Sequence, residues 1–166
     1  MASPRGHDSS AAFNNGFVTF RYPTSWSATV WKGRILHFNP MVYVSTETAQ
    51  HDPCRTTGME TVCGWPVSRL QRNGVIVRWE NRGFPGVDVG KFPGTTTSVG
   101  GRAARIAVQR PGICRSVGAD ETISVAISRP LASNWTQVDA CLRGPNLSAL
   151  EKQVHALLDT ARFTAP

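Results

Sequence analysis

The sequence predicts an α+β domain, in which an antiparallel β-sheet of about 6–8 strands packs on a C-terminal helix and one or two short helices. Three observations predict this fold class. Short runs of alternating apolar and polar residues recur through most of the chain, which is the pattern of half-buried strands. The C-terminal residues instead carry an apolar stripe at helical spacing. The predicted strands and helices do not alternate regularly, as they would in a parallel α/β sheet.

The size of the chain suits a single domain. Its 166 residues, 40% of them hydrophobic, are enough for one sizeable core and too few for two. The polar start, residues 1–12, lacks the apolar centre of a secretory signal, so we expect a disordered or artificially added segment there and a folded domain over 13–166. No apolar run approaches the roughly 18–20 residues that span a bilayer. We therefore expect membrane contact only through a segment outside this chain.

Four strands are predicted in the first part of the chain. In the first of them, Val18, Phe20 and Tyr22 share one face, and Pro23 ends the run. The second resumes the alternation, and the turn Lys32-Gly33-Arg34 leads into the third and fourth. The four strands cover 17–22, 27–31, 35–38 and 41–45.

The middle of the chain is predicted to hold a short helix followed by a strand. Residues 64–74 suit the helix, because Pro66 lies in its first turn and Asn73-Gly74 provide a left-handed stop. Apolar and polar residues alternate again over 75–80, which indicates a strand.

A loop, a hairpin and another strand are expected next. Gly and Pro are so frequent in 82–94 that we predict a loop there. Residues 95–98 and 102–110 are expected to pair as a hairpin around a Gly-Gly turn. The alternation in 123–127 predicts a half-buried strand.

Two helices complete the predicted fold. Trp135, Val138 and Leu142 recur at near-helical spacing, which predicts a short helix. The C-terminal helix is indicated by a capping box that runs from Ser148 to Glu151. Its apolar stripe consists of Leu150, Val154, Leu157, Leu158 and Ala161.

The four cysteines predict disulfides. Cys54, Cys63, Cys114 and Cys141 form an even set without the closely spaced pairs that structural zinc sites use. Of the three possible connectivities we favour the sequence-local pairs, Cys54 with Cys63 and Cys114 with Cys141. Free buried thiols, or a metal or redox site, remain alternatives. Disulfides would place the domain in an oxidising, extracytoplasmic space.

The net charge of +7 does not by itself predict nucleic-acid binding. Proteins that bind phosphate backbones cluster their basic residues, whereas the Arg residues of this chain are dispersed from Arg5 to Arg162. We therefore expect no nucleic-acid partner.

Two ends and one hairpin of the chain resemble a known family. Residues 17–23 with Trp26, the final helix running into 158–163, and the turn 99–103 are similar to PsbP/Mog1-like α/β domains, a fold that also occurs in exported actinobacterial lipoproteins. The cysteines and the Gly/Pro loop have no counterpart in that pattern. The resemblance implies a binding or accessory role, because members of this fold are mostly non-catalytic partners of other proteins and share no catalytic residues that could be carried over.

Tryptophan and arginine supply the candidate binding residues. The chain has five Trp, and Trp and Arg dominate binding hot spots. A local concentration of both could bind a carboxylate or phosphate, although core packing of the rings with scattered surface arginines is the favoured interpretation. The candidate residues are Trp65, Arg69, Arg72, Arg78 and Arg82.

Other chemistry-bearing residues favour structural roles. His37 alternates with apolar neighbours on a predicted strand, and His51 beside Asp52 suits a turn at the cysteine loop. Glu151, His155 and Asp159 are spaced four apart on the last helix, where ordinary solvated charge pairs are expected in place of a metal site.

The sequence therefore predicts an extracytoplasmic binding or accessory module of a cell-envelope or secreted protein, without catalysis, metal or cofactor. Its expected partner is another protein or an anionic envelope component. A cell-envelope hydrolase with an unidentified site is the alternative, and a basic nucleic-acid-binding domain ranks third. A deep pocket in which a His and a carboxylate converge would favour the hydrolase.

Overall fold

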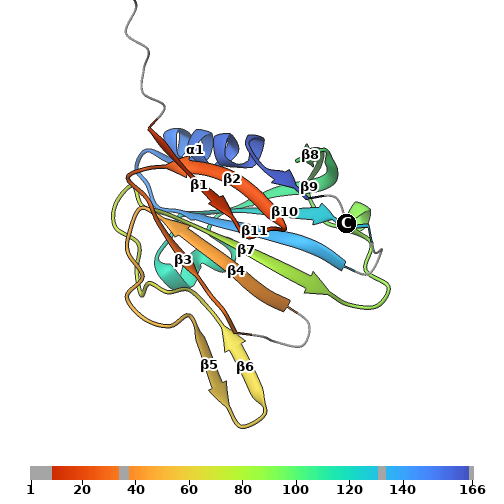
Figure 1. The fold of residues 1–166 in the computed structure, drawn as a ribbon. Helices are drawn as coiled ribbons and strands as arrows, with labels where there is room; N and C mark the ends of the chain where they lie inside the picture. The colour runs from red at the N-terminus through yellow and green to blue at the C-terminus, as the bar shows by residue number, and fades with distance from the viewer. Residues whose placement is uncertain (1–8, 34–37, 131–133, 165–166) are drawn as a thin grey trace, which may run out of the picture.

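A seven-stranded antiparallel sheet forms the centre of the molecule. The computed structural model describes residues 9–33, 38–130 and 134–164 (Figure 1). The strands of this sheet follow the order β3-β4-β7-β11-β10-β9-β8. Their bounds are β3 Ser27–Val30, β4 Phe38–Ser45, β7 Val75–Gly83, β8 Thr95–Val99, β9 Arg102–Gln109, β10 Glu121–Ser128 and β11 Asn134–Leu142.

One face of this sheet is covered by a helix and a smaller sheet. The helix is α1 (Leu147–Asp159), and the smaller sheet has the order β1-β2-β12. Phe20 of the smaller sheet stacks on Trp79 of β7, with ring centroids 4.8 Å apart, inside a core shared by both sheets and the helix. The bounds of the small strands are β1 Ser10–Asn14, β2 Val18–Pro23 and β12 Arg162–Phe163.

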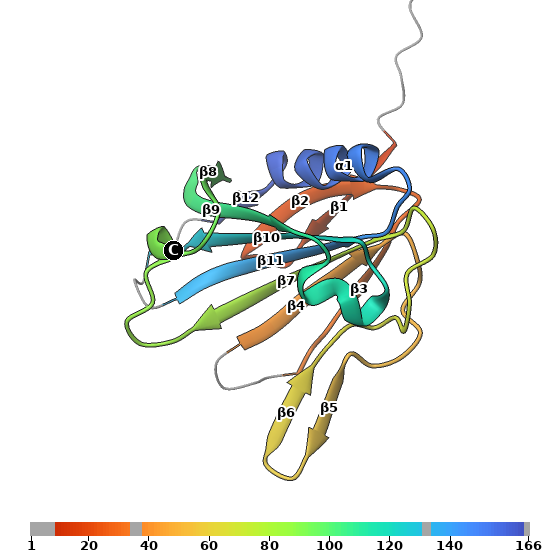
Figure 2. The same ribbon diagram turned by 180° about the vertical axis from the view of Figure 1, so that it is seen from behind.

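The opposite face carries a second, smaller core. The short 3-10 helix η2 (Gly112–Val117) lies over this face (Figure 2), and the Cys114–Cys141 disulfide ties it to β11. Residues 64–74 also cover the face, where Leu70 and Trp65 are buried in the second core. A second 3-10 helix, η1 (Val89–Lys91), lies in the loop before β8. None of the described helices is long and apolar enough to cross a membrane.

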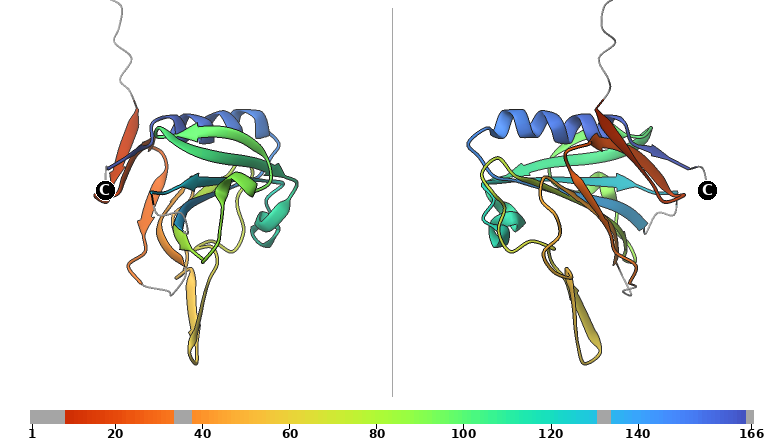
Figure 3. Two further views of the ribbon diagram at one scale, coloured as in Figure 1. Left: turned by 90° about the vertical axis from the view of Figure 1, so that its right-hand side faces the viewer. Right: turned by 60° about the vertical axis from the view of Figure 1, so that its left-hand side comes forward.

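A two-stranded hairpin projects from the body of the molecule (Figures 1 and 3). It consists of β5 (Cys54–Thr57) and β6 (Glu60–Cys63), and the Cys54–Cys63 disulfide joins its strands at the base. The sequence identified this segment only as a cysteine loop. Both cysteine pairs are those expected from the sequence.

The structure confirms the α+β class and several elements of the prediction. Strands lie at β2, β3, β7 and β10, and the β8–β9 hairpin turns through Gly100 and Gly101, whose φ angles are +58° and +79°. The strand count differs, because the described residues form twelve strands in three sheets. The strands predicted at 35–38 and 41–45 are one strand, β4, from Phe38 onward, and residues 34–37 lie outside the described part of the chain.

The helix predicted around Trp135 is wrong, because this segment is β11. The strand is paired on both sides, with β7 and β10, and its residues from Trp135 to Leu142 are all buried. A central strand that is buried on both faces does not need to alternate. Trp135, Val138 and Leu142 only appeared to have helical spacing. The polar residues between them, such as Asp139, are buried too, so the apolar residues alone do not mark the buried face.

The helix predicted at 64–74 is also wrong. Backbone groups of this segment bond to distant residues in place of their own helical turns: Leu70 N donates to Val117 O and Pro66 O accepts from Gln50 N. The left-handed stop is confirmed, since Asn73 has a φ of +57°.

The two ends of the domain need smaller corrections. Ser10 to Ala12, expected to belong to a disordered segment, form part of β1 and pair with β2, because Phe13 beside them is buried in the core. The C-terminal helix is confirmed, but it begins at Leu147 after Asn146. Leu147 packs against the core and is the first residue of the helix. Ser148 therefore lies inside the helix and forms no capping box.

Candidate functional site

A row of polar side chains crosses the second face of the large sheet. Tyr43, Arg78, Asp139 and Ser124 lie opposite one another on four adjacent strands, β4, β7, β11 and β10. Arg78 Nη2 donates to Asp139 Oδ2 at 3.1 Å, and Ser124 Oγ donates to Asp139 Oδ1 at 2.8 Å. Cross-strand neighbours on one face are close enough to interact, so the sheet register itself assembles this row.

Glu80 and Arg82 extend the row into a four-charge network. Arg78 Nε lies 2.9 Å from Glu80 Oε1, and Arg82 Nη2 lies 2.7 Å from Glu80 Oε2. Two guanidinium groups thus balance the two carboxylates of Glu80 and Asp139. Arg78, Glu80 and Asp139 are buried, whereas about a third of the Arg82 side chain is exposed.

Trp65 covers the buried end of this network. The guanidinium carbon of Arg78 lies 4.5 Å from the centre of the Trp65 ring, a cation–π distance, and the Tyr43 hydroxyl donates to Gly64 O at 3.2 Å. Burial raises the pKa of Tyr43 to about 12, with the Arg78 charge acting in the opposite direction. Burial alone would lower the pKa of Arg78, but the charges of Glu80 and Asp139 outweigh it and raise that pKa.

The five candidate residues are not one surface. Trp65, Arg78 and Arg82 belong to the network, where Trp65 and Arg78 are buried. Arg69 and Arg72 are exposed on the 64–74 segment and make no ion pair in the described part of the chain. Charge partners therefore occupy Arg78 and Arg82, and only Arg69, Arg72 and part of Arg82 face solvent.

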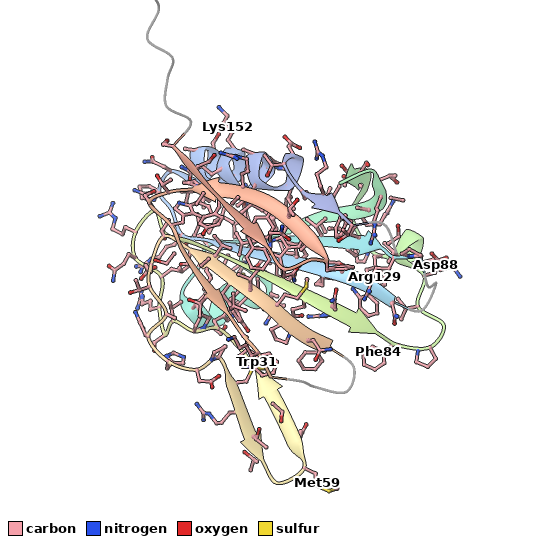
Figure 4. All side chains as sticks on the ribbon, in the orientation of Figure 1. Trp31, Met59, Phe84, Asp88, Arg129 and Lys152 are labelled. Atoms are coloured by element: carbon pink, nitrogen blue, oxygen red, sulfur yellow. A yellow bond between two sulfur atoms is a disulfide. The ribbon has the colours of Figure 1, made fainter. Side chains whose placement is uncertain are left out.

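The β5–β6 hairpin is the most exposed element among the described residues. None of its residues is buried, and Met59 at its tip is fully exposed (Figure 4). Val62 on β6 has 60% of its surface exposed. The strands are held by the Cys54–Cys63 disulfide and by a hydrogen bond of 2.9 Å between the Thr56 and Thr61 hydroxyls.

One face of the hairpin borders a groove of about 430 Å³. The register pairs Arg55 with Val62 and Thr57 with Glu60, and these four side chains all line the groove. Trp65 lies at its base, so one predicted site residue joins the network to the hairpin. Only the cysteine spacing and Gly58 could have indicated this hairpin from the sequence; Gly58 has a φ of +65° in the turn.

The histidines do not form a catalytic arrangement in the described residues. His51 and Asp52 are both exposed at the edge of the hairpin groove, and Asp52 Oδ1 accepts a hydrogen bond from Cys54 N at 2.8 Å, as expected for a turn. His37 lies outside the described part of the chain.

The Glu151, His155 and Asp159 spacing on α1 produces no metal cluster. No group of three or more His, Cys, Asp or Glu in the described ranges is arranged to hold a metal ion. Glu151 instead lies against Glu121 of β10, and Arg110 pairs with Glu121 at 2.8 Å. Burial and the neighbouring Glu121 raise the pKa of Glu151.

Comparison with known proteins assigns no relative. No protein-family model matches the chain, and no curated protein matches it. A functional assignment therefore depends on the geometry described above.

Proposed function

We propose that this domain is an extracytoplasmic binding or accessory module, without catalysis of its own, that contacts a partner protein through the β5–β6 hairpin. The observation that carries the proposal is that this hairpin is covalently closed and yet none of its strand residues is buried. The groove along one face of the hairpin, which Trp65 also lines, completes the proposed contact surface.

The hairpin does not serve the core of this domain. Its side chains belong to neither hydrophobic core cluster, and an isolated two-stranded hairpin is at best marginally stable in water. A disulfide across its base limits the conformational freedom of the unfolded hairpin and so favours the folded one. A stiffened arm that contributes no core side chain is best explained by contacts made outside the domain.

The exposed chemistry of the arm suits a protein partner. Met59 and Val62 offer apolar surface, and flexible Met side chains are frequent at binding surfaces. The outer edges of β5 and β6 are unpaired in the described sheets, which leaves backbone groups available for an added strand. The groove face carries charges of both signs, Arg55 and Glu60, which does not favour a polyanion.

Two disulfides are consistent with an oxidising, extracytoplasmic compartment. Within that setting we propose a cell-envelope or secreted protein. The resemblance of both chain ends to PsbP/Mog1-like domains agrees with an accessory role, and it remains part of the proposal.

Site-specific photocrosslinking tests the function. A benzoylphenylalanine is placed at position 59 and, as the control, at the exposed position 152 on α1. Each protein is then irradiated with the envelope fraction of the cell in which it naturally occurs. We expect a discrete protein adduct from position 59 that is absent from position 152. Equal adduct patterns from both positions, or no adduct from position 59, would contradict the proposal.

A further inference from the structure

Two arginines face each other at the end of the β9–β10 ladder. The β9–β10 pairing ends with Ala104 opposite Ile127, and its continuation by two residues sets Arg102 opposite Arg129 on the face that packs against the smaller sheet. Ser128 Oγ donates to Ala103 O at 2.9 Å, so the strands still lie together at this point. Like charges directly opposite on neighbouring strands destabilise a sheet.

Aromatic rings hold both guanidinium groups. Arg129 lies 4.7 Å from the centre of the Phe17 ring, and Arg102 lies 4.2 Å from Phe163 and 5.8 Å from Phe17. The two rings meet edge to face at 5.6 Å. Phe163 is fixed in turn by the β8–β9 turn, because a Cβ on Gly100 would come within 2.7 Å of it. The arrangement is therefore part of the packed structure.

No acidic side chain compensates these two charges in the described part of the chain. Neither arginine takes part in any ion pair or side-chain hydrogen bond there, and Arg102 Nη1 is buried without an acceptor. Burial lowers the pKa of Arg102, and burial together with the Arg102 charge lowers the pKa of Arg129. A buried donor without a partner normally indicates a missing acceptor.

Open space adjoins Arg129, one member of the pair. Arg129 lines a groove of about 400 Å³ beside Thr96 and Arg105, at the side of the molecule away from the hairpin tip (Figure 4). Asp88 lines the same groove, but its carboxylate accepts from Gly90 N at 2.9 Å and forms no ion pair with Arg129 in the described residues.

We propose that Arg102 and Arg129 form a binding site for a phosphate group. Two guanidinium groups carry two positive charges, which a phosphate monoester balances near neutral pH, whereas a carboxylate would leave one uncompensated. Planar guanidinium forks match the oxygens of a phosphate and supply charge-assisted hydrogen bonds. Phe17 and Phe163 hold the forks from behind, so that the donors are preorganised. This site is independent of the hairpin surface.

Calorimetric titration with inorganic phosphate and with phenyl phosphate tests the site. The proteins are the wild type, Arg102→Gln, Arg129→Gln and the control Arg115→Gln, whose side chain is exposed and lies on η2. We expect binding to weaken about 10- to 100-fold in the two site variants, the range that one or two lost charge-assisted hydrogen bonds produce. Arg115→Gln should bind like the wild type.

Lysine variants and vesicles complete the test. Arg102→Lys and Arg129→Lys keep the charge and lose the fork, so we expect weaker binding from them even if a glutamine variant fails to fold. Phosphatidylcholine vesicles with and without phosphatidic acid distinguish the source: retention that depends on both arginines assigns a lipid headgroup, and binding of soluble esters alone assigns a free phosphate. Phosphate affinity that is absent from the wild type, or equal in all variants, would overturn the site.

Discussion

The guanidinium of Arg78 lies 4.5 Å from the centre of the Trp65 ring, and this stacking closes a charge network inside the second core. Beneath the ring, Arg78 bridges Glu80 and Asp139. All three charged side chains are buried, so each needs the others. The network therefore acts as a structural element that fixes Trp65 at the base of the hairpin groove.

Arg78→Ala should destabilise the fold strongly. Removal of this guanidinium leaves Glu80 and Asp139 buried with less compensation, for which about 3–5 kcal/mol of unfolding free energy is the usual loss. Urea unfolding followed by tryptophan fluorescence measures it. Arg72→Ala is the matched control, and because Arg72 is exposed we expect a change within about 0.5 kcal/mol. A loss of under about 1 kcal/mol for Arg78→Ala would show that the network contributes little.

Tyr43 should make stability depend on alkaline pH. Its folded pKa of about 12 lies above the ordinary tyrosine value of 10.0, so the folded state favours the neutral phenol. Its contribution is complete below pH 10 and is lost as the pH rises through about 12, for a total of roughly 2–3 kcal/mol. Denaturant unfolding between these pH values should show this slope in the wild type and a smaller one in Tyr43→Phe. Identical slopes would exclude Tyr43 as the cause.

The two disulfides should contribute unequally to global stability. Cys114 and Cys141 are fully buried and join η2 to the central strand, so replacing both with Ser should lower the unfolding free energy by about 2–4 kcal/mol. Replacing Cys54 and Cys63 with Ser frees only the projecting hairpin, and we expect a change of under about 1 kcal/mol. Thermal and urea unfolding of both double variants provide the comparison. A larger loss from the hairpin pair would mean that the hairpin supports the core.

Glu151→Gln should stabilise the domain at neutral pH. Burial and the adjacent Glu121 raise the pKa of Glu151, so its folded form favours the proton, and that contribution is lost as the pH rises through the raised value. An amide removes the charge repulsion, which should add about 0.5 kcal/mol near pH 7 and nothing at pH values where Glu151 is protonated. Glu60→Gln, on the exposed hairpin, is the control. An equal effect of both substitutions across the pH range would contradict the coupling.

Sequence periodicity predicted the edges of this fold better than its centre. Strand β2 alternates because one of its faces is less buried, and α1 shows its stripe because its outer face is polar. Strand β11 conceals its period, because Asp139 is buried against Arg78 of the neighbouring strand and Gln137 is buried beside it, where its amide donates to Asp139 Oδ1. The 64–74 helix failed for a related reason, because bonds to Val117 and Gln50 replaced helical ones.

The candidate site was predictable only in part. The local concentration of Trp and Arg grouped Trp65 with Arg78. The burial of Arg78 depends on its ion pairs with Glu80 and Asp139, and Asp139 lies far along the chain. Arg102 and Arg129 are brought together by strand register alone, which a single sequence does not reveal. The disulfide pairing could be predicted because cysteines close in sequence pair readily. The projection of the hairpin could not be predicted, because it depends on how the hairpin is placed relative to the large sheet.

The affinity of Met59→Asp for the partner captured at position 59 tests the central claim most directly. Surface plasmon resonance with that partner should show at least about a tenfold loss for Met59→Asp, the effect of about 1.4 kcal/mol at one contact residue, with an unchanged unfolding midpoint. Lys152→Asp, on the exposed side of α1, should bind like the wild type. Full affinity in Met59→Asp would show that the hairpin is not the binding arm.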